Sequence, residues 1–440
     1  MARRRVRSPL SVYLNSRLVG RLKRQVSGAI DFQYDETWLA WKHALPVSLS
    51  LPLREDRYIG APVVAVFDNL LPDSEQIRRR MAERVHADGY DAYSLLAAVG
   101  RDCVGALQFL PENVRPAGAG LVEGRAVSDG KIARIIRELN QYPLGVSEDD
   151  AFRISIAGAQ EKTALLQWKG RWHIPLGTTA TTHIFKPQIG KLRNGIDLTR
   201  SVENEYLCLR LVKAFGLPAA DAVIKDFEDQ RVLVIERFDR HWTRDNRLLR
   251  LPQEDCCQSL SVPPTKKYEP DGGPGLKALL NFLKASDEPG SDQEMFMQAQ
   301  ILFWLLGATD GHAKNFSIFL LPGGRFHLTP LYDIMTAQPN LDAGQLRHNQ
   351  MKFAMAVGDK RHYVFRTIGP RHFVQTAIRA GFAQTRLNKI FEAIVTDAPI
   401  VLGNTVADLP EDFPQQLVDS TIQGFNQRLR IVGEYLKAEP

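Results

Sequence analysis

Alternating apolar and polar residues predict that the chain begins with β-strands. Residues 10–24 alternate through "LSVYLNSRLVGRLK", and the Asn-Ser-Arg break at 15–17 suits a hairpin turn. The stretch "ALPVSLSLPL" at 44–53 predicts another short extended run. The first hundred residues are therefore expected to be mixed and β-rich.

A change of pattern follows. Residues 111–127 are rich in Pro, Gly and Ala, which indicates a connection, and the next helix is expected to carry Ile132, Ile135, Ile136 and Leu139 on one face. Strand patterns then return. The expected strands are residues 152–156, "TALLQW" and "RWHIP" across a Gly-Arg turn, "THIFKP", "AVIKDF" and "RVLVIERF".

Helical patterns dominate the rest of the chain. A helix is expected over 204–216, ended by Gly216, and the chain beyond 250 is expected to be mostly helical through its last apolar-striped segment. Strands first and helices after predict an α+β protein with a β-rich lobe and a helical lobe, and a ligand cleft between lobes is the natural site. The expected divisions are 1–110, 111–150, 151–240 and 241–440.

Composition says more about the cellular compartment of the protein than about its function. The formal charge of +6, spread over 56 basic and 50 acidic residues, is mild and does not favour direct reading of a DNA sequence. The four cysteines show neither a disulfide framework nor a zinc spacing, which favours a reducing cytoplasm. The start lacks the apolar stretch of a signal peptide, and no segment is expected to span a membrane.

The segment "ISIAGAQEKTALL" at 154–166 is a candidate phosphate-binding loop. A Walker loop requires Gly before its Lys-Ser/Thr pair and a helix after it, but here Glu161 precedes Lys162 and a strand pattern follows. Between two strands, the small residues Ala157, Gly158 and Ala159 would instead let backbone amides approach ATP phosphates as in kinases. A plain hairpin turn is the alternative interpretation.

Asp310 and Asn315 stand five residues apart in "GATDGHAKNF", just after a helix that Gly307 is expected to end. Kinase catalytic loops carry an acid that accepts the proton of the attacking hydroxyl and an Asn that binds magnesium at this spacing. Asp333 in "LYDIM" follows in the right order as a second oxygen ligand. In the alternative interpretation Asp310 caps a helix and Asp333 anchors a turn.

Two further segments fit a kinase. Lys186, on an apolar strand, stands where a kinase lysine grips phosphates, and Glu203 or Glu205 on the next helix could orient it. Residues 236–238 stand where an interlobe hinge would offer backbone groups to adenine. Asp239 could meet ribose, or pair with Arg237 or Arg240.

Taken together, these motifs resemble the HipA family of serine/threonine kinase toxins, which act in HipA/HipB toxin–antitoxin modules and have a phosphoinositide-kinase-related fold. The resemblance spans the chain through "SLSLPL", "VFDNLLPDS", "GRDCVGALQF", "FRISIAGAQEKTALL", "THIFKP", "LVIERFDR", "LPQEDCCQ", "GATDGHAKNFSIF", "LTPLYDI" and "MKFAMAVG". It implies that residues 1–110 are the HipA N-terminal subdomain, 151–240 the nucleotide-binding lobe and 241–440 the catalytic lobe.

The resemblance also implies site roles. Asp310 would be the catalytic base, Asn315 and Asp333 would bind Mg²⁺, and Ser155 would be an inhibitory autophosphorylation site, since a new phosphate repels a loop built to hold another. The residues implied around ATP are Ala157, Gly158, Ala159, Gln160, Glu161, Lys162, Lys186, Glu236, Arg237, Phe238, His312, Ala313, Lys314, Asn315, Tyr332 and Asp333.

Partners follow from the same resemblance. It implies a small helix-turn-helix antitoxin, HipB, operator DNA reached through that antitoxin, and glutamyl-tRNA synthetase as the protein phosphorylated to stall translation. The basic residues Lys360, Arg361, Arg366, Arg371 and Arg379 could touch DNA, but Ile378 and Gly381 stand where the family would carry basic residues. A solvated helix face is the better interpretation of that region.

Two other functions remain open at this point. One is a corepressor that acts through HipB and DNA with ATP as ligand only. The other is a kinase of small molecules or lipids, because acceptor choice depends on surfaces that a motif does not describe.

Overall fold

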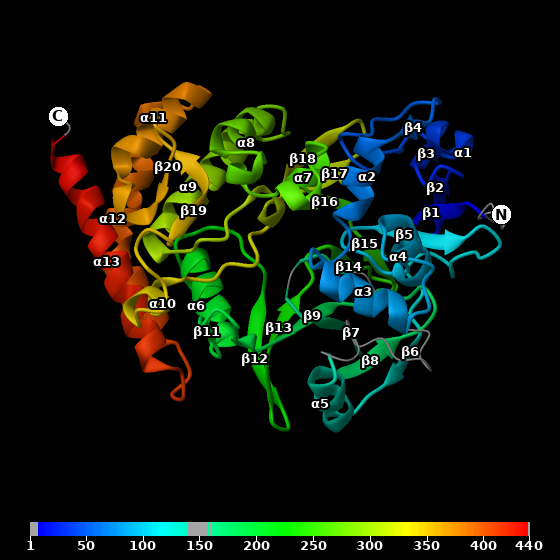
Figure 1. The fold of residues 1–440 in the computed structure, drawn as a ribbon, viewed down its shortest axis with the longest axis horizontal. Coiled ribbons are helices and arrows are strands. Elements are labelled where there is room, and N and C mark those ends of the chain that lie inside the picture. Colours follow the sequence, from blue (N-terminus) through cyan, green and yellow to red (C-terminus); the bar gives the residue numbers. More distant parts are fainter. Residues whose placement is uncertain (1–7, 140–155, 159, 439–440) are drawn as a thin grey trace. The chain divides into compact units, whose positions relative to one another are not determined.

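The computed structural model describes residues 8–139, 156–158 and 160–438, and they form two compact units (Figure 1). The strand-rich unit comprises Met1–Pro187, Lys225–Thr265 and Ser317–Phe326. The helical unit comprises Gln188–Ile224, Lys266–Phe316 and His327–Pro440. Each unit therefore draws on separate stretches of the chain, whereas the boundaries expected from the sequence are contiguous ranges and remain predictions.

A five-stranded antiparallel sheet opens the strand-rich unit, in the order β4-β3-β2-β1-β5. The expected hairpin is confirmed, since Asn15 and Ser16 turn the chain with φ of 44° and 69° between its first two strands. The buried Phe67 packs against Phe32 and against Phe109, which belong to two strands of the sheet. The elements are β1 (Leu10–Leu14), β2 (Arg17–Arg24), β3 (Ile30–Tyr34), β4 (Tyr58–Ile59), β5 (Leu107–Pro111), α1 (Glu36–Leu39), α2 (Ala61–Asp68), α3 (Glu75–Arg84) and α4 (Ala92–Val99).

The extended run expected at 44–53 is wrong, because that segment forms no strand. Pro46 and Pro52 each remove a backbone donor that a strand ladder would need. Hydrogen bonds to residues 254 and 258 hold the segment instead. Leu49 N donates to Glu254 Oε1 at 2.9 Å, and Ser50 Oγ donates to the carbonyl oxygen of Gln258 at 2.8 Å. The segment is thereby fixed as an irregular loop whose first half is buried.

A six-stranded sheet carries the second half of the strand-rich unit, in the order β12-β13-β9-β7-β8-β6. Its strands are β6 (Gly124–Ala126), β7 (Thr163–Trp168), β8 (Arg171–Pro175), β9 (His183–Pro187), β12 (Ala222–Phe227) and β13 (Gln230–Glu236). The predicted strands after residue 160 are confirmed. Of the strand expected at 152–156, residues 152–155 lie outside the described residues, and Ile156 is not in a strand.

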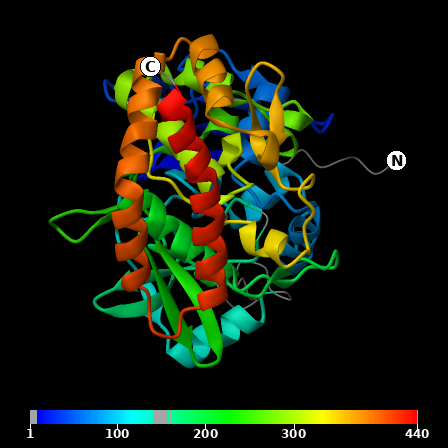
Figure 2. The ribbon, with the colours of Figure 1, turned by 90° about the vertical axis from the view of Figure 1, so that its left-hand side faces the viewer.

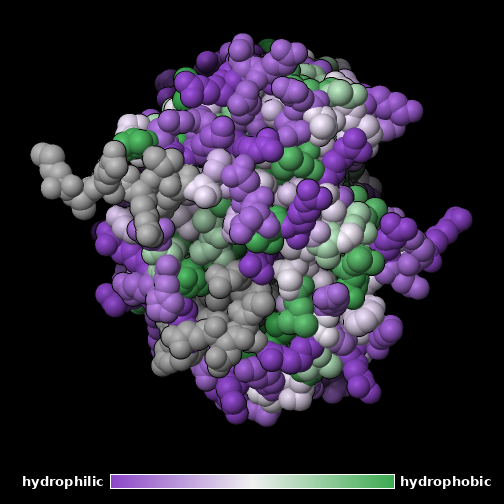
Figure 3. Space-filling model, turned by 90° about the vertical axis from the view of Figure 1, so that its right-hand side faces the viewer, coloured by the Kyte–Doolittle hydropathy of each residue, from purple (hydrophilic) through white to green (hydrophobic). Residues whose placement is uncertain are grey.

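Smaller elements complete this unit. They are α5 (Asp129–Arg137), β14 (Arg240–Trp242), β15 (Leu248–Arg250), β16 (Gln253–Asp255), α7 (Cys256–Ser259), the 3-10 turn η1 (Pro264–Lys266), β17 (Ser317–Leu321) and β18 (Arg325–Leu328). The predicted apolar face of α5 is confirmed, because Ile132, Ile135 and Ile136 are buried, as is Leu139 just after it. On the face in Figure 3, hydrophilic side chains predominate and apolar ones are scattered among them.

The helical unit is built on α9 (Pro289–Leu306), whose last turns are buried throughout. Gly307 ends it in the left-handed conformation at φ 75°, as expected from the sequence. The other elements are β10 (Gly190–Lys191), β11 (Asp197–Leu198), α6 (Ser201–Ala214), η2 (Glu269–Asp271), α8 (Leu276–Leu283), η3 (Ala313–Asn315), α10 (Gln338–Asp342), β19 (Lys352–Val357), β20 (His362–Val364), η4 (Phe365–Thr367), α11 (Pro370–Ala380), α12 (Gln384–Ala407) and α13 (Gln415–Ala438).

The two long C-terminal helices, α12 and α13, lie side by side (Figure 2). By length and composition alone α12 could cross a membrane, although no membrane-spanning segment was predicted from the sequence. Its buried positions Leu387, Phe391, Ile394 and Leu402 recur at helical spacing, and it also packs against α6, α9 and α11. These contacts are those of a helix packed against its neighbours in the unit.

Candidate active site

The segment after α9 folds into a tight loop around the carbonyl group of Asp310. That oxygen accepts hydrogen bonds from the backbone N–H of His312 and from Nδ2 of Asn315, both at 2.8 Å. Gly311 has no room for a side chain, because a Cβ there would lie 2.6 Å from the ring of Phe303. The loop therefore fixes the separation of Asp310 and Asn315.

The chain around Asp333 is tied to the same loop from the other side. Ala308 and Thr336 form an antiparallel bridge, and Ala337 N donates to the carbonyl oxygen of Gly307 at 2.9 Å. The side chain of Asn204 on α6 accepts from Thr336 N and donates to Thr336 O, each at 2.8 Å. Segments far apart in sequence therefore meet at the end of α9.

Asp333 has an unusual backbone, with φ of 59°. Asp tolerates this left-handed region better than most residues, and such conformations concentrate at functional sites. The hydroxyl of the preceding Tyr332 donates to the carbonyl oxygen of Lys314 at 3.0 Å. The structure thus brings together Asp310, Asn315, Tyr332 and Asp333. Asp310 caps neither of the helical turns that flank it, whose caps are Gly307 and His312.

The donor set fits a magnesium ion better than a softer metal. Because Asn315 uses its amide nitrogen on Asp310, its amide oxygen remains for a ligand, and Asp333 supplies a carboxylate. Within the described residues, no three His, Cys, Asp or Glu side chains form a metal-binding group. Magnesium prefers oxygen ligands and is commonly held by one or two protein groups with substrate phosphates and water.

His312 lies beside these acids with its side chain only 2% exposed, and its Nε2 is 3.7 Å from Asp310 Oδ1. Burial lowers its pKa below 6.5, although Asp310 and Asp333 act in the opposite direction. The ring is therefore neutral at pH 7. Neither ring nitrogen finds a hydrogen-bond partner in another described residue.

Tyr268 completes this cluster and was not expected from the sequence. Its hydroxyl donates a hydrogen bond to Asp310 Oδ1, and its ring meets that of His312 edge-on, with centroids 4.7 Å apart. The sequence feature that could have drawn attention to Tyr268 is the glycine-rich segment "YEPDGGPG", which predicts a turn just after this tyrosine.

In the strand-rich unit, the lysine at the end of the candidate phosphate loop lies against the glycine of the same loop. Gly158 has φ of 113°, and a Cβ at that position would lie 2.5 Å from Nζ of the buried Lys162. Its carbonyl oxygen accepts from Asp73 N at 3.0 Å, and Gln160 Nε2 donates to the carbonyl oxygen of Pro187 at 3.0 Å. The structure therefore requires Gly at 158. Ser155 and Ala159 lie outside the described residues.

An ion pair that was not predicted from the sequence also holds this loop, and it is called the loop brace below. Arg80 on α3 pairs with Glu161, and both side chains are largely shielded, at 28% and 22% exposure. The neighbouring Arg78 pairs with Asp68 at 2.5 Å and ties α3 to the end of α2. No sequence pattern links residue 80 to residue 161, because the pair forms only through tertiary packing.

Lys186 is buried on β9, opposite Leu233 of β13 in the sheet. Glu236 closes the same ladder opposite His183, and Arg237 N donates to the carbonyl oxygen of Thr182 at 2.9 Å. Phe238 meets Phe319 edge-on, with ring centroids 6.0 Å apart. The start of the expected hinge is therefore part of the sheet.

The side chain of Arg237 belongs to a buried charge network. It pairs with Asp239 at 2.8 Å and with Asp102 at 3.4 Å, and Asp102 also receives Arg240 and Arg250. Burial opposes ionisation of both acids, yet the guanidinium groups hold their pKa values below 3.8. Of the two roles expected for Asp239, the structure shows the ion pair with Arg237 and Arg240.

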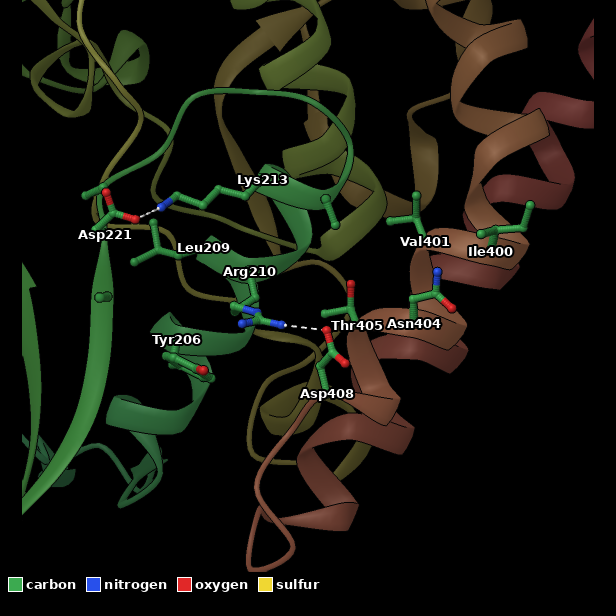
Figure 4. A pocket seen from close by; sticks show the side chains of 13 residues that line it. Tyr206, Leu209, Arg210, Lys213, Asp221, Ile400, Val401, Asn404, Thr405 and Asp408 are labelled. Atoms are coloured by element: carbon green, nitrogen blue, oxygen red, sulfur yellow. Dashed lines mark hydrogen bonds and ion pairs between the residues drawn. The ribbon is translucent and has the colours of Figure 1, made fainter.

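A separate hollow of about 510 Å³ in the helical unit lies between α6 and α12 (Figure 4). Its two basic side chains are already paired, Arg210 with Asp408 at 3.1 Å and Lys213 with Asp221. None of the residues expected at the nucleotide site lines it. The described cysteines, Cys103, Cys208, Cys256 and Cys257, are buried and free.

Comparisons with known proteins find similarity to HipA proteins along most of the chain. Residues 154–401 match the family model described as the HipA-like C-terminal domain, and residues 10–110 match the HipA N-terminal domain. The kinase-named protein Y4mE of Sinorhizobium fredii is 34% identical over 80% of this chain and 81% of its own. The serine/threonine-protein kinase toxin HipA of Shewanella oneidensis is 26% identical over 80% of this chain and 79% of its own.

Among solved structures, the chain is similar to the Shewanella oneidensis HipA, HipB and operator DNA complex. The match covers 98% of this chain and 100% of that chain, with a TM-score of 0.80 and 23% identity. The expected fold class is confirmed by this match: a kinase-like α+β chain with a β-rich N-terminal part and a mostly helical C-terminal lobe.

Proposed function

The chain belongs to the HipA family of serine/threonine kinase toxins, and from this premise we propose that it is itself a Mg-ATP-dependent serine/threonine protein kinase. The observation that carries the proposal is the meeting of Asp310, Asn315 and Asp333 at the end of α9. A base and oxygen ligands for magnesium are among the parts that phosphoryl transfer requires of a protein.

Asp310 is the base in this proposal. Its side chain is 47% exposed, so an incoming alcohol can approach and donate its proton to the carboxylate. Asn315 and Asp333 would hold a magnesium ion, which would offset the charge of the phosphates. The neutral, buried His312 packs beside Asp310, with Ala313 and Lys314 continuing the loop and Tyr332 anchoring it to Asp333.

Lys162 and Lys186 are proposed to bind the phosphates. Both are buried lysines on or beside the strands that follow the loop, and a lysine ammonium is a common phosphate ligand. Residues 157–162 would offer backbone amides, and residues 236–238 would line the adenine side. Because the Arg237 side chain is committed to its acids, only its backbone is available for that role. Phosphorylation of Ser155 would oppose phosphate binding by like-charge repulsion.

The proposed partner is supported by a solved relative, whereas the proposed substrate comes from the family resemblance alone. The solved complex of the Shewanella oneidensis protein contains HipB and operator DNA, which supports a HipB-like helix-turn-helix antitoxin here and DNA reached through it. Glutamyl-tRNA synthetase is the proposed protein substrate, and its phosphorylation would stall translation and arrest growth. The proposal therefore places the chain in the cytoplasm.

The direct test adds γ-³²P-labelled ATP and Mg²⁺ to the purified protein with a bacterial extract, and identifies the labelled bands. A labelled glutamyl-tRNA synthetase, with label lost in Asp310→Asn, would support the full proposal. A labelled lipid or metabolite would indicate the small-molecule kinase. Nucleotide binding with no labelled product would favour the corepressor.

A further inference from the structure

The contact between Tyr268 and Asp310 carries an inference beyond the roles above. The tyrosine hydroxyl meets the carboxylate oxygen of the proposed base, and both residues belong to the helical unit. An acceptor alcohol must make the same contact, an O–H donated to Asp310, before it can be deprotonated. The tyrosine thus mimics the acceptor.

The turn after Tyr268 is built to hold that position. The carbonyl oxygen of Tyr268 accepts from Asp271 N at 3.1 Å and from Gly273 N at 2.9 Å. Gly272 has φ of 91°, and a Cβ on Gly273 would lie 2.1 Å from the carbonyl oxygen of Lys266. Two adjacent positions therefore require glycine, which indicates a defined turn and not a loose loop.

A second anchor joins this turn to β19. Glu269, the next residue, accepts a hydrogen bond from Ala356 N at 2.6 Å and pairs with Arg361 at 3.1 Å. A Cβ on Gly275 would lie 2.4 Å from the carboxyl carbon of Glu269, so this glycine lets the acid sit against the backbone. Tyr268 is held from both sides, while the bond to Asp310 is the part that an acceptor can replace.

Resting on the proposed kinase function, we propose that Tyr268 is an acceptor gate: its hydroxyl occupies the base until a protein hydroxyl displaces it. Water is a poor competitor for the site because it brings no binding surface of its own, whereas a protein serine is delivered with many other contacts. The gate therefore suppresses futile ATP hydrolysis and selects acceptors that are bound by a larger surface. Tyr268 is a specificity-determining residue in this account and not a base.

The test compares Tyr268→Phe with the matched control Tyr206→Phe on α6. Phosphate release from Mg-ATP without acceptor should rise roughly fivefold in Tyr268→Phe, the effect of removing about one hydrogen bond. The KM for a dephosphorylated casein probe should fall by a similar factor while the KM for ATP stays unchanged. An unchanged or slower hydrolysis would overturn the gate, because a positioning tyrosine would help both acceptors.

A readout that needs no catalysis separates the gate from the proposed function. Water-soluble carbodiimide should modify the Asp310 carboxyl several-fold faster in Tyr268→Phe than in the wild type or Tyr206→Phe, as followed by mass spectrometry. Equal rates would contradict the gate whatever the kinase does. If Tyr268→Phe is modified faster but neither the wild type nor any variant transfers phosphate, the contact between Tyr268 and Asp310 is supported and the kinase proposal is refuted.

Discussion

Asn315 Nδ2 donates to the carbonyl oxygen of Asp310 at 2.8 Å, so the proposed metal ligand and the proposed base are held by one hydrogen bond. This bond also orients the Asn315 amide, since the nitrogen faces the loop and the oxygen is left for a cation. The orientation of one proposed ligand is therefore fixed before any metal binds, as expected of a preorganised site.

Asp333→Asn should weaken metal use with little loss of fold. Asn tolerates a φ of 59° as well as Asp does, so the backbone is preserved while the ligand loses its charge. The Mg²⁺ concentration for half-maximal phosphate transfer should rise by roughly tenfold or more. A magnesium titration at saturating ATP measures this concentration, with Asp397→Asn at an exposed position of α12 as the control. The same half-saturation in both variants would remove Asp333 from the metal site.

Asn204→Ala should affect stability and activity together. The variant leaves the buried N–H and C=O of Thr336 without their side-chain partner, which costs about 2 kcal/mol of unfolding free energy. Because Thr336 is bridged to Ala308, the Asp333 segment should also loosen against the loop that carries Asp310. Urea unfolding and label transfer test both effects beside the exposed control Asn404→Ala. Full activity in Asn204→Ala would show that this tie does not position Asp333.

Arg80→Ala should raise the KM for ATP by a few-fold while leaving kcat nearly unchanged. The variant removes the partner of Glu161, leaves a negative charge beside the proposed phosphate site, and frees the loop. The charge-swapped pair Arg80→Glu with Glu161→Arg should recover part of the lost affinity. If the swapped pair binds ATP no better than Arg80→Ala, the loop brace acts through packing and not through charge.

Glu254→Gln should become more stabilising as pH rises. Burial raises the pKa of Glu254 to about 7 from 4.5, so the folded protein keeps a proton that the unfolded chain releases. Stability from this group is complete below pH 4.5 and is lost as pH rises through about 7, by an amount of about 3 kcal/mol.

The glutamine keeps an oxygen to accept from Leu49 and cannot ionise. Urea midpoints of wild type and variant should therefore be similar near pH 4.5 and should separate in favour of the variant by pH 8. A constant difference across that range would show that Glu254 does not titrate in the folded protein.

Local patterns predicted much of the fold. The β1–β2 hairpin, the strands after residue 160, and α9 with its closing Gly307 follow from periodicity and turn residues. The strand predicted at 44–53 is wrong for a physical reason. The alternation of apolar and polar residues is real, but prolines remove backbone donors, and the segment forms hydrogen bonds to the Glu254 side chain and the Gln258 carbonyl oxygen instead of to a neighbouring strand.

The proposed active-site segment could likewise be predicted from the sequence, because Asp310, Asn315 and Asp333 have a characteristic order and spacing. The residues that hold them were not. Asn204, Arg80 and Tyr268 act through partners 132, 81 and 42 positions away, and single-sequence patterns carry no information at such distances. Tertiary contacts of this kind appear only when the chain is folded.

The most direct test of the central claim measures ATP binding and phosphate transfer on the same samples of wild type and Asp310→Asn. Calorimetry with Mg-ATP should give similar affinities for both proteins, because the amide replaces a partly exposed group that binds no nucleotide. Transfer of ³²P from labelled ATP should occur in the wild type and fall by about 10²-fold or more in Asp310→Asn. Equal transfer by the two proteins would contradict the assignment of Asp310 as the base, and with it the proposed active site.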